Sequence, residues 1–303
     1  MAEMSLEKPK RALSKPLLHY IKRPDQPWGQ WVLAWWPERW WAHLILILAC
    51  IVIGFPLYYA IIVATQSQGE VYAYKFTFGD SFAENWNIVV NNRNLFTYIG
   101  NSIFIAIVVT ACKTVLSLLS GLAFVYFRFP FKWLVFGFVL VTLMMPTEIL
   151  IIALFRFVNS LGWGNTYLAL IVPFIASATG TFLFRQHFSN IPSELSEAAQ
   201  LDGANPFQFL IRVLVPISWN TIGALAVIQF VYVWNMYIWP VMIIKDPSRQ
   251  VVQAGLRTLI GGDAALVYGP MMLGAVLASI PPVIVFILLQ KQFMSGFAVT
   301  RDK

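Results

Sequence analysis

Six long apolar runs dominate this 303-residue chain, and each is as long as, or longer than, the roughly 20 residues that a helix needs to cross a bilayer. Apolar residues make up 58% of the chain and charged residues 12%, against roughly 45–50% and 25% in soluble domains. We therefore predict an all-α integral membrane protein. The second run is overlong, which predicts tilting or extension beyond the bilayer. The predicted spans are Trp41–Ala64, Phe96–Phe127, Trp133–Phe155, Tyr167–Phe184, Ser218–Ile244 and Pro270–Phe293.

Lys and Arg are unevenly divided between the segments that connect these runs. With the N-terminus in the cytosol, fourteen of them fall on the inner side and six on the outer side. The positive-inside rule then predicts that both termini are cytoplasmic. The net charge of +7 reflects this asymmetry beside an anionic inner leaflet. It gives no reason to expect a nucleic-acid partner.

Residues 1–40 are predicted to form a cytoplasmic tail ahead of the first span. Trp28, Trp31 and Trp35 recur at helical spacing, which indicates a short helix lying at the membrane interface. The alternative is an aromatic belt that anchors the first span. Residues 41–303 are predicted to form one membrane domain.

Residues that hold metals or form disulfides are sparse. Cys50 and Cys112 both fall inside predicted spans, and the three histidines, His19, His43 and His187, are scattered. We therefore predict neither a disulfide framework nor a metal centre. A membrane enzyme would need a cluster of His, Asp or Ser at one membrane face, and the sequence does not suggest one.

A polar segment, residues 191–216, separates the fourth and fifth apolar runs. Pro192 ends the preceding structure, Ser193 is a candidate helix cap, and Glu194 and Glu197 supply an acidic first turn. Gly203 is placed to end this helix in a left-handed conformation. We expect this helix to bind a basic partner.

A second short helix is predicted directly after Gly203. Asn205 is a good cap, Pro206 suits the first helical position, and Gln208 can bond back to the cap. Pro216 is expected to end the helix. The residues expected on its apolar face are Phe207, Leu210, Ile211 and Leu214.

The spacing in this segment resembles the EAA loop of permease subunits in bacterial ATP-binding-cassette importers. The matching residues are Glu197, Ala198 and Ala199, Gly203 four positions later, and the closing run Val213-Leu214-Val215-Pro216, in which valines replace the Ile and Leu of the family pattern. The carbohydrate and glycerol-3-phosphate branch is similar over residues 45–300. The motifs that carry this likeness are Phe55-Pro56-Leu57-Tyr58, Phe127-Arg128-Phe129-Pro130, Thr142-Leu143-Met144-Met145-Pro146, Ala176-Ser177-Ala178-Thr179, Phe182-Leu183-Phe184-Arg185-Gln186 and Trp234-Asn235-Met236-Tyr237-Ile238-Trp239-Pro240.

This resemblance implies a six-helix permease domain in the bacterial inner membrane, with residues 191–216 as its cytoplasmic coupling loop. It implies four kinds of partner: a second permease, either homologous or identical, two copies of an ATPase subunit, an extracytoplasmic solute-binding protein, and the lipid membrane. The chain has no Gly-Lys-Ser or Gly-Lys-Thr phosphate loop. We therefore expect no enzyme activity and no cofactor in this chain, with ATP and Mg bound by the partner ATPase. The coupling residues implied are Glu197, Ala198, Ala199, Asp202, Gly203, Pro206 and Pro216.

Ionisable residues inside spans usually face a cavity or a partner, because hydrocarbon does not solvate them. Lys113 and Glu148 are the two candidates, and Pro146 predicts a bend next to Glu148. Either the two side chains pair, or they contact the solute. The fifth span adds amides and aromatic rings ahead of a break predicted at Pro240. The candidate pathway residues are Lys113, Glu148, Gln229, Trp234, Asn235 and Tyr237.

Several solutes fit these residues. A phosphate calls for a cation such as Lys113, which favours glycerol-3-phosphate. Glu148 with Trp234 and Tyr237 would suit the choline group of a glycerophosphodiester. A related importer of maltose or another oligosaccharide is the alternative, and a stand-alone secondary carrier would leave the polar segment without a role.

Overall fold

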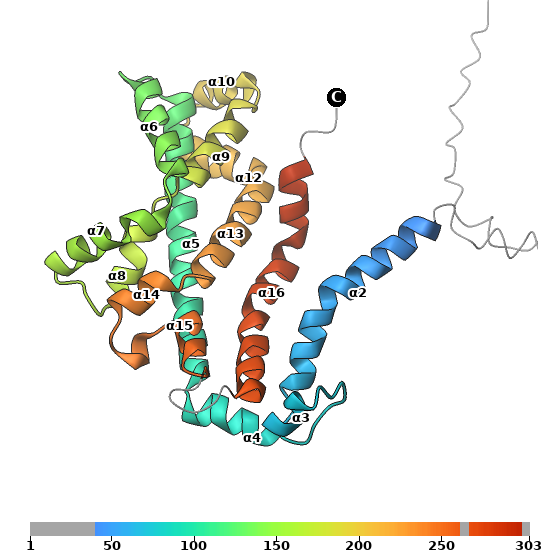
Figure 1. The fold of residues 1–303 in the computed structure, drawn as a ribbon. Coiled ribbons are helices and arrows are strands. Elements are labelled where there is room, and N and C mark those ends of the chain that lie inside the picture. The colour runs from blue at the N-terminus through green and yellow to red at the C-terminus, as the bar shows by residue number, and fades with distance from the viewer. Residues whose placement is uncertain (1–39, 261–266, 299–303) are drawn as a thin grey trace, which may run out of the picture. The chain divides into compact units, whose positions relative to one another are not determined.

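A computed structural model describes residues 40–260 and 267–298, apart from the side chains of residues 147, 148 and 296–298. Every element in this part of the chain is helical (Figure 1). The contacts divide the chain into two units, Met1–Tyr58 and Tyr59–Lys303. The predicted tail and its interfacial helix lie outside the described residues, except that Trp40 already begins the first helix.

The elements include long α-helices and short π- and 3₁₀-helices. Elements η2 and η4 are π-helical, whereas η3 and η5 are 3₁₀-helical. In chain order the elements are α2 (Trp40–Val63), α3 (Gln68–Tyr72), α4 (Phe82–Trp86), η2 (Asn87–Asn92), α5 (Leu95–Tyr126), α6 (Lys132–Met144), α7 (Thr147–Ser160), α8 (Tyr167–Ile171), η3 (Val172–Phe174), α9 (Ala178–Ser189), α10 (Ser193–Leu201), α11 (Pro206–Phe209), η4 (Leu210–Leu214), α12 (Val215–Ile217), α13 (Trp219–Trp234), α14 (Ile238–Ile243), η5 (Pro247–Arg249), α15 (Val252–Arg257) and α16 (Tyr268–Ala298).

Four helical stretches of the described chain are long and apolar enough to cross a membrane, and two bent pairs raise this to as many as six. The four are α2, α5, the stretch from α8 to α9, and α16, at the predicted first, second, fourth and sixth spans. The predicted third span bends by 106° between α6 and α7. The bend falls at Met145 and Pro146, because proline disfavours a helical residue before it and has no N–H to donate.

The prediction for the fifth span, Ser218–Ile244, is wrong in the site of its break. Helix α13 ends at Trp234, and α14 begins only at Ile238. Pro240 lies inside α14 and does not break it. It is the third helical residue, where the backbone N–H has no intrahelical partner, so the missing donor costs nothing.

The centre of the second unit is built on α5. This helix packs against α9 and α13, and α13 packs against α16. Glycines allow two of these close approaches: a Cβ atom added to Gly121 would lie 2.7 Å from the Cβ atom of Phe184, and one added to Gly223 would lie 2.4 Å from that of Gln292. Small residues at helix contacts are typical of membrane proteins.

Candidate functional site: a capped coupling segment and a cavity

The first helix of the polar segment, α10, ends as the sequence predicts. Gly203 has a φ of +73°, in the left-handed region that favours glycine. The N–H of Ala204 donates to the carbonyl of Ala199 at 2.9 Å, and that of Gly203 donates to Gln200 at 3.0 Å. These two bonds form a Schellman motif, which satisfies the carbonyls at the helix end. The start differs from the prediction, because Pro192 takes the cap position and Ser193 is already helical.

The second helix is capped as predicted. The Asn205 side chain accepts from the N–H of Gln208 at 2.8 Å, and the Gln208 side chain accepts from the N–H of Asn205 at 3.0 Å. This reciprocal pair is a capping box. Pro206 occupies the first helical position. The two caps fix the turn between α10 and α11 from local sequence alone.

The prediction that Pro216 ends this helix is wrong. Helical backbone runs from Pro206 to Ile217, and an 81° bend at Ser218 leads into α13. The predicted apolar face is also partly wrong, because Phe207 and Ile211 are exposed. Phe209 is buried in place of Phe207, together with Leu210 and Leu214.

The buried side of this segment belongs to a set that we call the coupling cluster. It joins η4 and its neighbours to the ends of α5, α9 and α13, and Ala199 of α10 packs against it. The polar segment is therefore packed directly against three helices. The cluster consists of Leu118, Leu122, Phe184, Phe188, Phe209, Leu210, Leu214 and Leu225.

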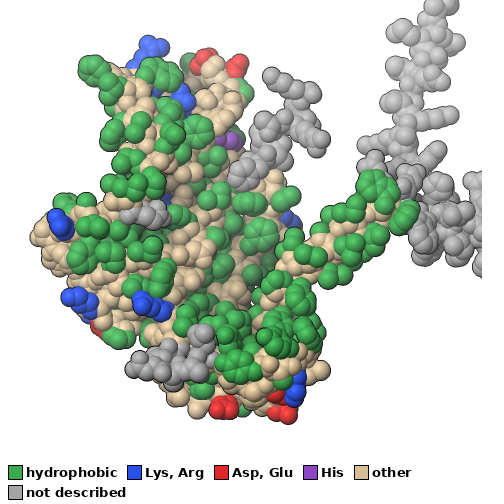
Figure 2. All heavy atoms as spheres, in the orientation of Figure 1, with side chains coloured by type: hydrophobic (Ala, Val, Ile, Leu, Met, Phe, Trp, Pro, Cys, Tyr) green, Lys and Arg blue, Asp and Glu red, His purple; other side chains and the backbone are tan. Residues whose placement is uncertain are grey.

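The predicted coupling residues form an accessible surface. Glu197, Asp202 and Gly203 are exposed, and Ala199 is half-buried against the coupling cluster. Figure 2 shows acidic side chains gathered at the α10 end of the molecule. The exposed members also include Ala198, Pro206 and Pro216.

Lys113 lies at the junction of three helices, although it sits in the middle of an apolar span. Its side chain is only 5% exposed. The ammonium Nζ donates to Gln229 Oε1 on α13 at 2.8 Å, and Gln229 Nε2 donates to Ser177 Oγ, the cap of α9, at 3.1 Å. The ring of Tyr232 lies 4.6 Å from Nζ. An amide and an aromatic ring thus replace the water that Lys113 lacks.

A cavity of about 890 Å³ opens beside this lysine. Three predicted pathway residues line it: Lys113, Asn235 and Tyr237. Gln229 stands behind Lys113 and does not line the cavity. Tyr232 also lines it and was missed, although its position three residues after Gln229 places both on one helix face.

Two other predicted pathway residues, Trp234 and Glu148, are not among the described residues that line the cavity. Trp234 is 3% exposed and stacks on Phe230 with ring centroids 5.8 Å apart, so it packs in the core and does not line the cavity. Glu148 belongs to α7, whose residues Leu150 and Leu154 line the cavity. Its side chain lies outside the described part, so pairing with Lys113 stays a prediction.

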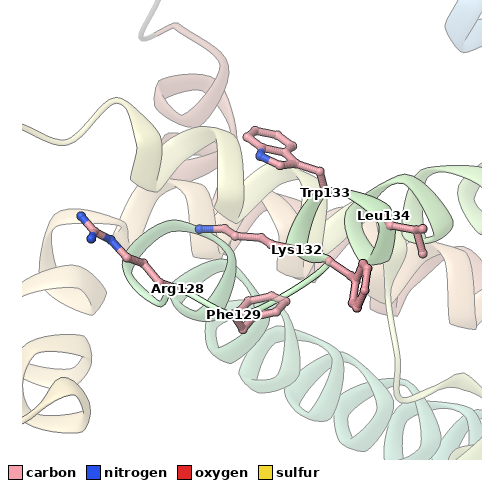
Figure 3. Close-up of a pocket in the computed structure, with 6 residues that line it drawn as sticks. Arg128, Phe129, Lys132, Trp133 and Leu134 are labelled. Atoms are coloured by element: carbon pink, nitrogen blue, oxygen red, sulfur yellow. The ribbon is translucent and has the colours of Figure 1, made fainter.

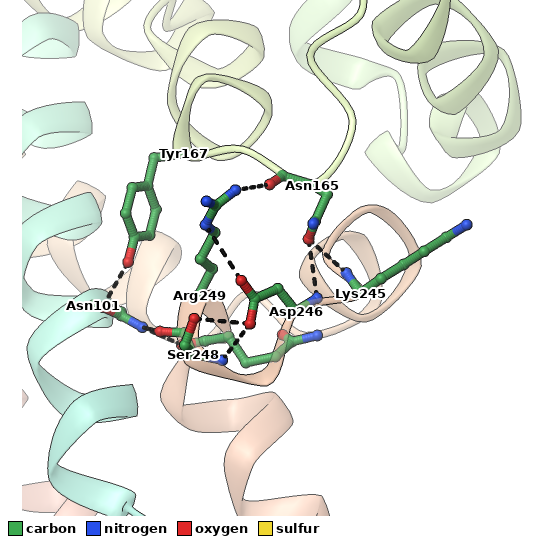
Figure 4. A network of polar contacts seen from close by, with 8 residues as sticks. Asn101, Asn165, Tyr167, Lys245, Asp246, Ser248 and Arg249 are labelled. Carbon is green, nitrogen blue, oxygen red and sulfur yellow. Dashed lines mark hydrogen bonds and ion pairs between the residues drawn. The ribbon is translucent and has the colours of Figure 1, made fainter.

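A polar network holds the opposite end of the molecule together (Figure 4). Asn165 Oδ1 accepts from the N–H groups of Lys245 and Asp246, each at 3.0 Å. Asn101 of α5 donates to the carbonyls of Ser248 and Gln250 at 2.8 and 2.9 Å. The segment between α14 and α15 is therefore tied to α5 and to the loop before α8 by bonds to its backbone groups.

The comparisons with known proteins agree with this architecture. Residues 113–298 match the family model described as binding-protein-dependent transport system inner membrane component. The chain is similar to the sn-glycerol-3-phosphate transport system permease protein UgpE of Brucella melitensis, with 36% identity over 85% of this chain and 95% of the relative. UgpE of Agrobacterium fabrum is 37% identical over 86% of this chain and 95% of its own length, and that of Escherichia coli O6:K15:H31 is 38% identical over 84% and 94%.

The fold has a counterpart among solved structures. A crystal structure of a bacterial ABC transporter involved in the import of the acidic polysaccharide alginate superposes with a TM-score of 0.75. The match covers 89% of this chain and all of that chain, at 18% identity. With its helical fold, its capped polar segment and these matches, the chain belongs to the family of binding-protein-dependent transport system inner membrane components, as an ABC importer permease.

Proposed function

We propose that this permease carries sn-glycerol-3-phosphate across the inner membrane as one half of an ATP-driven importer. The relatives that are 36–38% identical to it over the aligned residues are named for that solute. The observation that carries the proposal on this chain is Lys113, a buried cation on the wall of a cavity. A phosphate that passes through needs such a charge, and Lys113 has three donors, of which Gln229 takes one.

The other lining groups suit the glycerol part of this solute. Asn235 and Tyr237 bring an amide and a hydroxyl, which can bond to polyol hydroxyls. Apolar lining from Leu150, Leu154 and Ile228 keeps the remaining wall from binding the solute tightly. A glycerophosphodiester fits the same cation, and a maltose-type sugar does not need it.

The polar segment, residues 191–216, is proposed to couple this chain to ATP hydrolysis by its partner subunits. Two ATPase subunits would bind ATP and Mg and hydrolyse ATP. One of them would bind the exposed surface around Glu197 and Gly203. In this proposal the chain itself binds no cofactor and has no catalytic activity. The coupling cluster then transmits the movement to α5, α9 and α13. A second permease would complete the pathway, and an extracytoplasmic solute-binding protein would deliver the solute. In this proposal both termini lie in the cytoplasm, as the positive-inside rule predicts.

Uptake by two matched variants tests the role of Lys113. Lys113→Met removes the cation, whereas Gln229→Met removes its hydrogen-bond partner and keeps the cation. In cells that lack only this chain, Lys113→Met should lower uptake of labelled glycerol-3-phosphate about tenfold or more, the worth of a charge-assisted bond. Gln229→Met should lower this uptake less, and the complexes of both variants should assemble normally.

Equal losses in the two variants would show that Lys113 acts only as a structural partner of Gln229. Normal uptake by Lys113→Met would refute its contact with the solute. Parallel uptake of glycerophosphocholine and maltose identifies the solute class. Solute pumping by the isolated chain without an ATPase would overturn the importer assignment itself.

A further inference from the structure

A basic hollow lies at the loop between α5 and α6, and none of its lining residues lines the cavity beside Lys113. It has a volume of about 460 Å³ and is lined by Arg128, Phe129, Phe131, Lys132, Trp133 and Leu134. In Figure 3 the side chains of Arg128 and Lys132 extend to the same side of this loop. None of these residues takes part in the transport mechanism above.

Three cations gather here, because Arg128 and Lys132 line the hollow and Arg185 stacks on Trp133, which also lines it. The positive charges of Arg185 and Arg128 both act on Lys132. In the described part of the chain, the two ion pairs are Lys75–Glu70 and Arg249–Asp246, and neither involves this cluster. Like charges held together repel unless an anion joins them, so the cluster is arranged for a ligand that carries negative charge.

The donors of this cluster remain available. Lys132 Nζ donates to the carbonyls of Phe127 at 3.0 Å and Val125 at 3.4 Å, which orients it at the end of α5 and leaves one of its three N–H donors for a ligand. The guanidinium of Arg185 stacks on the rings of Trp133 and Phe136, 4.9 and 4.2 Å from their centroids. Stacking uses the face of the guanidinium, so its N–H edge can still bind a phosphate in bidentate fashion.

Exposed apolar side chains surround the same hollow. Phe131 is 77% exposed, and Trp133 and Leu134 are each 70% exposed. Phe131 has a φ of +57°, which holds this ring at the loop that starts α6. Aromatic rings next to Lys and Arg at the end of a membrane helix mark the level of lipid headgroups. A soluble anion would gain nothing from these rings, whereas the glycerol and acyl parts of a lipid would.

We propose that this hollow binds the phosphate of an anionic phospholipid, with Arg128, Lys132 and Arg185 around the headgroup and Phe131, Trp133 and Leu134 against its apolar part. Basic pockets of this kind beside membrane helices bind anionic headgroups. The site fixes the α5–α6 loop to the bilayer surface. It depends on the chain being a membrane protein, and it does not depend on which solute is carried.

Native mass spectrometry of the detergent-purified complex tests this site with phosphatidylglycerol and phosphatidylcholine. Phosphatidylglycerol should be retained in preference. Arg128→Gln should lower its retention about fivefold, the effect of one cation near an anionic surface, because no protein contact of that side chain is lost. Arg128→Lys should restore most of the binding. Lys291→Gln, which removes an exposed cation of α16, is the matched control and should bind normally.

Three results would overturn the proposal. Equal retention of the two lipids would show that the headgroup charge is not recognised. Displacement of phosphatidylglycerol by excess inorganic phosphate would assign the hollow to a soluble anion. The Arg128→Gln complex could also bind lipid normally but lose the ATPase subunit. That result would show that the hollow is a contact with another protein. Solute uptake is not measured, so failure here leaves the proposed transport function intact.

Discussion

The turn after α10 requires a glycine at position 203 because of its backbone conformation, and not because a side chain there would clash with a neighbour. Its φ is +73°, and a Cβ atom added there would meet no atom within 4 Å. A side chain therefore brings no clash with a neighbour and only the strain of the left-handed region, about 1–2 kcal/mol for an L-residue. The strain acts on the turn that separates α10 from the capped α11.

Gly203→Val is expected to distort this turn and to lower uptake strongly while insertion in the membrane stays normal. β-Branched residues tolerate the left-handed region least. The matched control is Gly203→Asn, because asparagine adopts this conformation readily and should keep most of the uptake. Uptake, the amount of chain in the membrane and ATPase co-purification are measured together. Equal activity of both variants would remove backbone conformation from the coupling mechanism.

At the scale of elements, the short helix α3 depends on one carboxylate. Glu70 accepts from the N–H and the hydroxyl of Ser67, each at 3.1 Å, and pairs with Lys75 at 3.3 Å. The bonds from Ser67 and the charge of Lys75 lower the pKa of Glu70 below its usual 4.5. Because the folded pKa is lowered, the stabilisation is fully present above about pH 4.5 and is lost as the pH falls through the folded pKa.

Glu70→Gln is expected to loosen the segment around α3 at neutral pH. Hydrogen exchange of residues 67–79, corrected for its intrinsic pH dependence, should be faster in the variant at pH 7. The difference from the parent should shrink toward zero as the pH falls through the lowered pKa of Glu70, where the carboxylate of the parent becomes protonated. A difference that persists unchanged in acid would show that the carboxylate charge does not hold α3.

Local sequence predicts the caps in this protein and fails where packing decides. Gly203 and Asn205 were predictable because their roles depend on residues at most five positions away. The bend at Ser218 and the π-helical turn before it were not, since both arise where the coupling cluster buries the chain. The break predicted at Pro240 is wrong because the effect of a proline depends on its position in the helix. Pro240 lies in the first turn of α14, and local sequence does not determine where that helix starts.

The candidate site shows the same division. Lys113 was found because a cation in an apolar span needs a reason to be there. Its partner Gln229 was named, but the bond between them joins residues 116 positions apart, and spacing cannot reveal it. Trp234 was misplaced because composition does not tell which side of α13 a ring faces, and it packs on Phe230.

At the scale of the whole molecule, the transport model requires the two polar ends to lie on opposite sides of the membrane. Glu197 is exposed on α10, and Lys245 is exposed in the network that Asn165 and Asn101 hold together. The distribution of Lys and Arg predicts that Glu197 lies in the cytoplasm and Lys245 outside. An ATPase can reach only the first, and a solute-binding protein only the second.

Labelling with a membrane-impermeant maleimide tests this arrangement in a parent chain whose Cys50 and Cys112 are replaced by alanine. The Lys245→Cys variant should react in intact spheroplasts. The Glu197→Cys variant should react only after the membrane is opened, and less so when the ATPase subunits are present, because they would cover that surface. Reaction of Glu197→Cys in intact spheroplasts would invert the topology and separate the coupling segment from any ATP-driven motor.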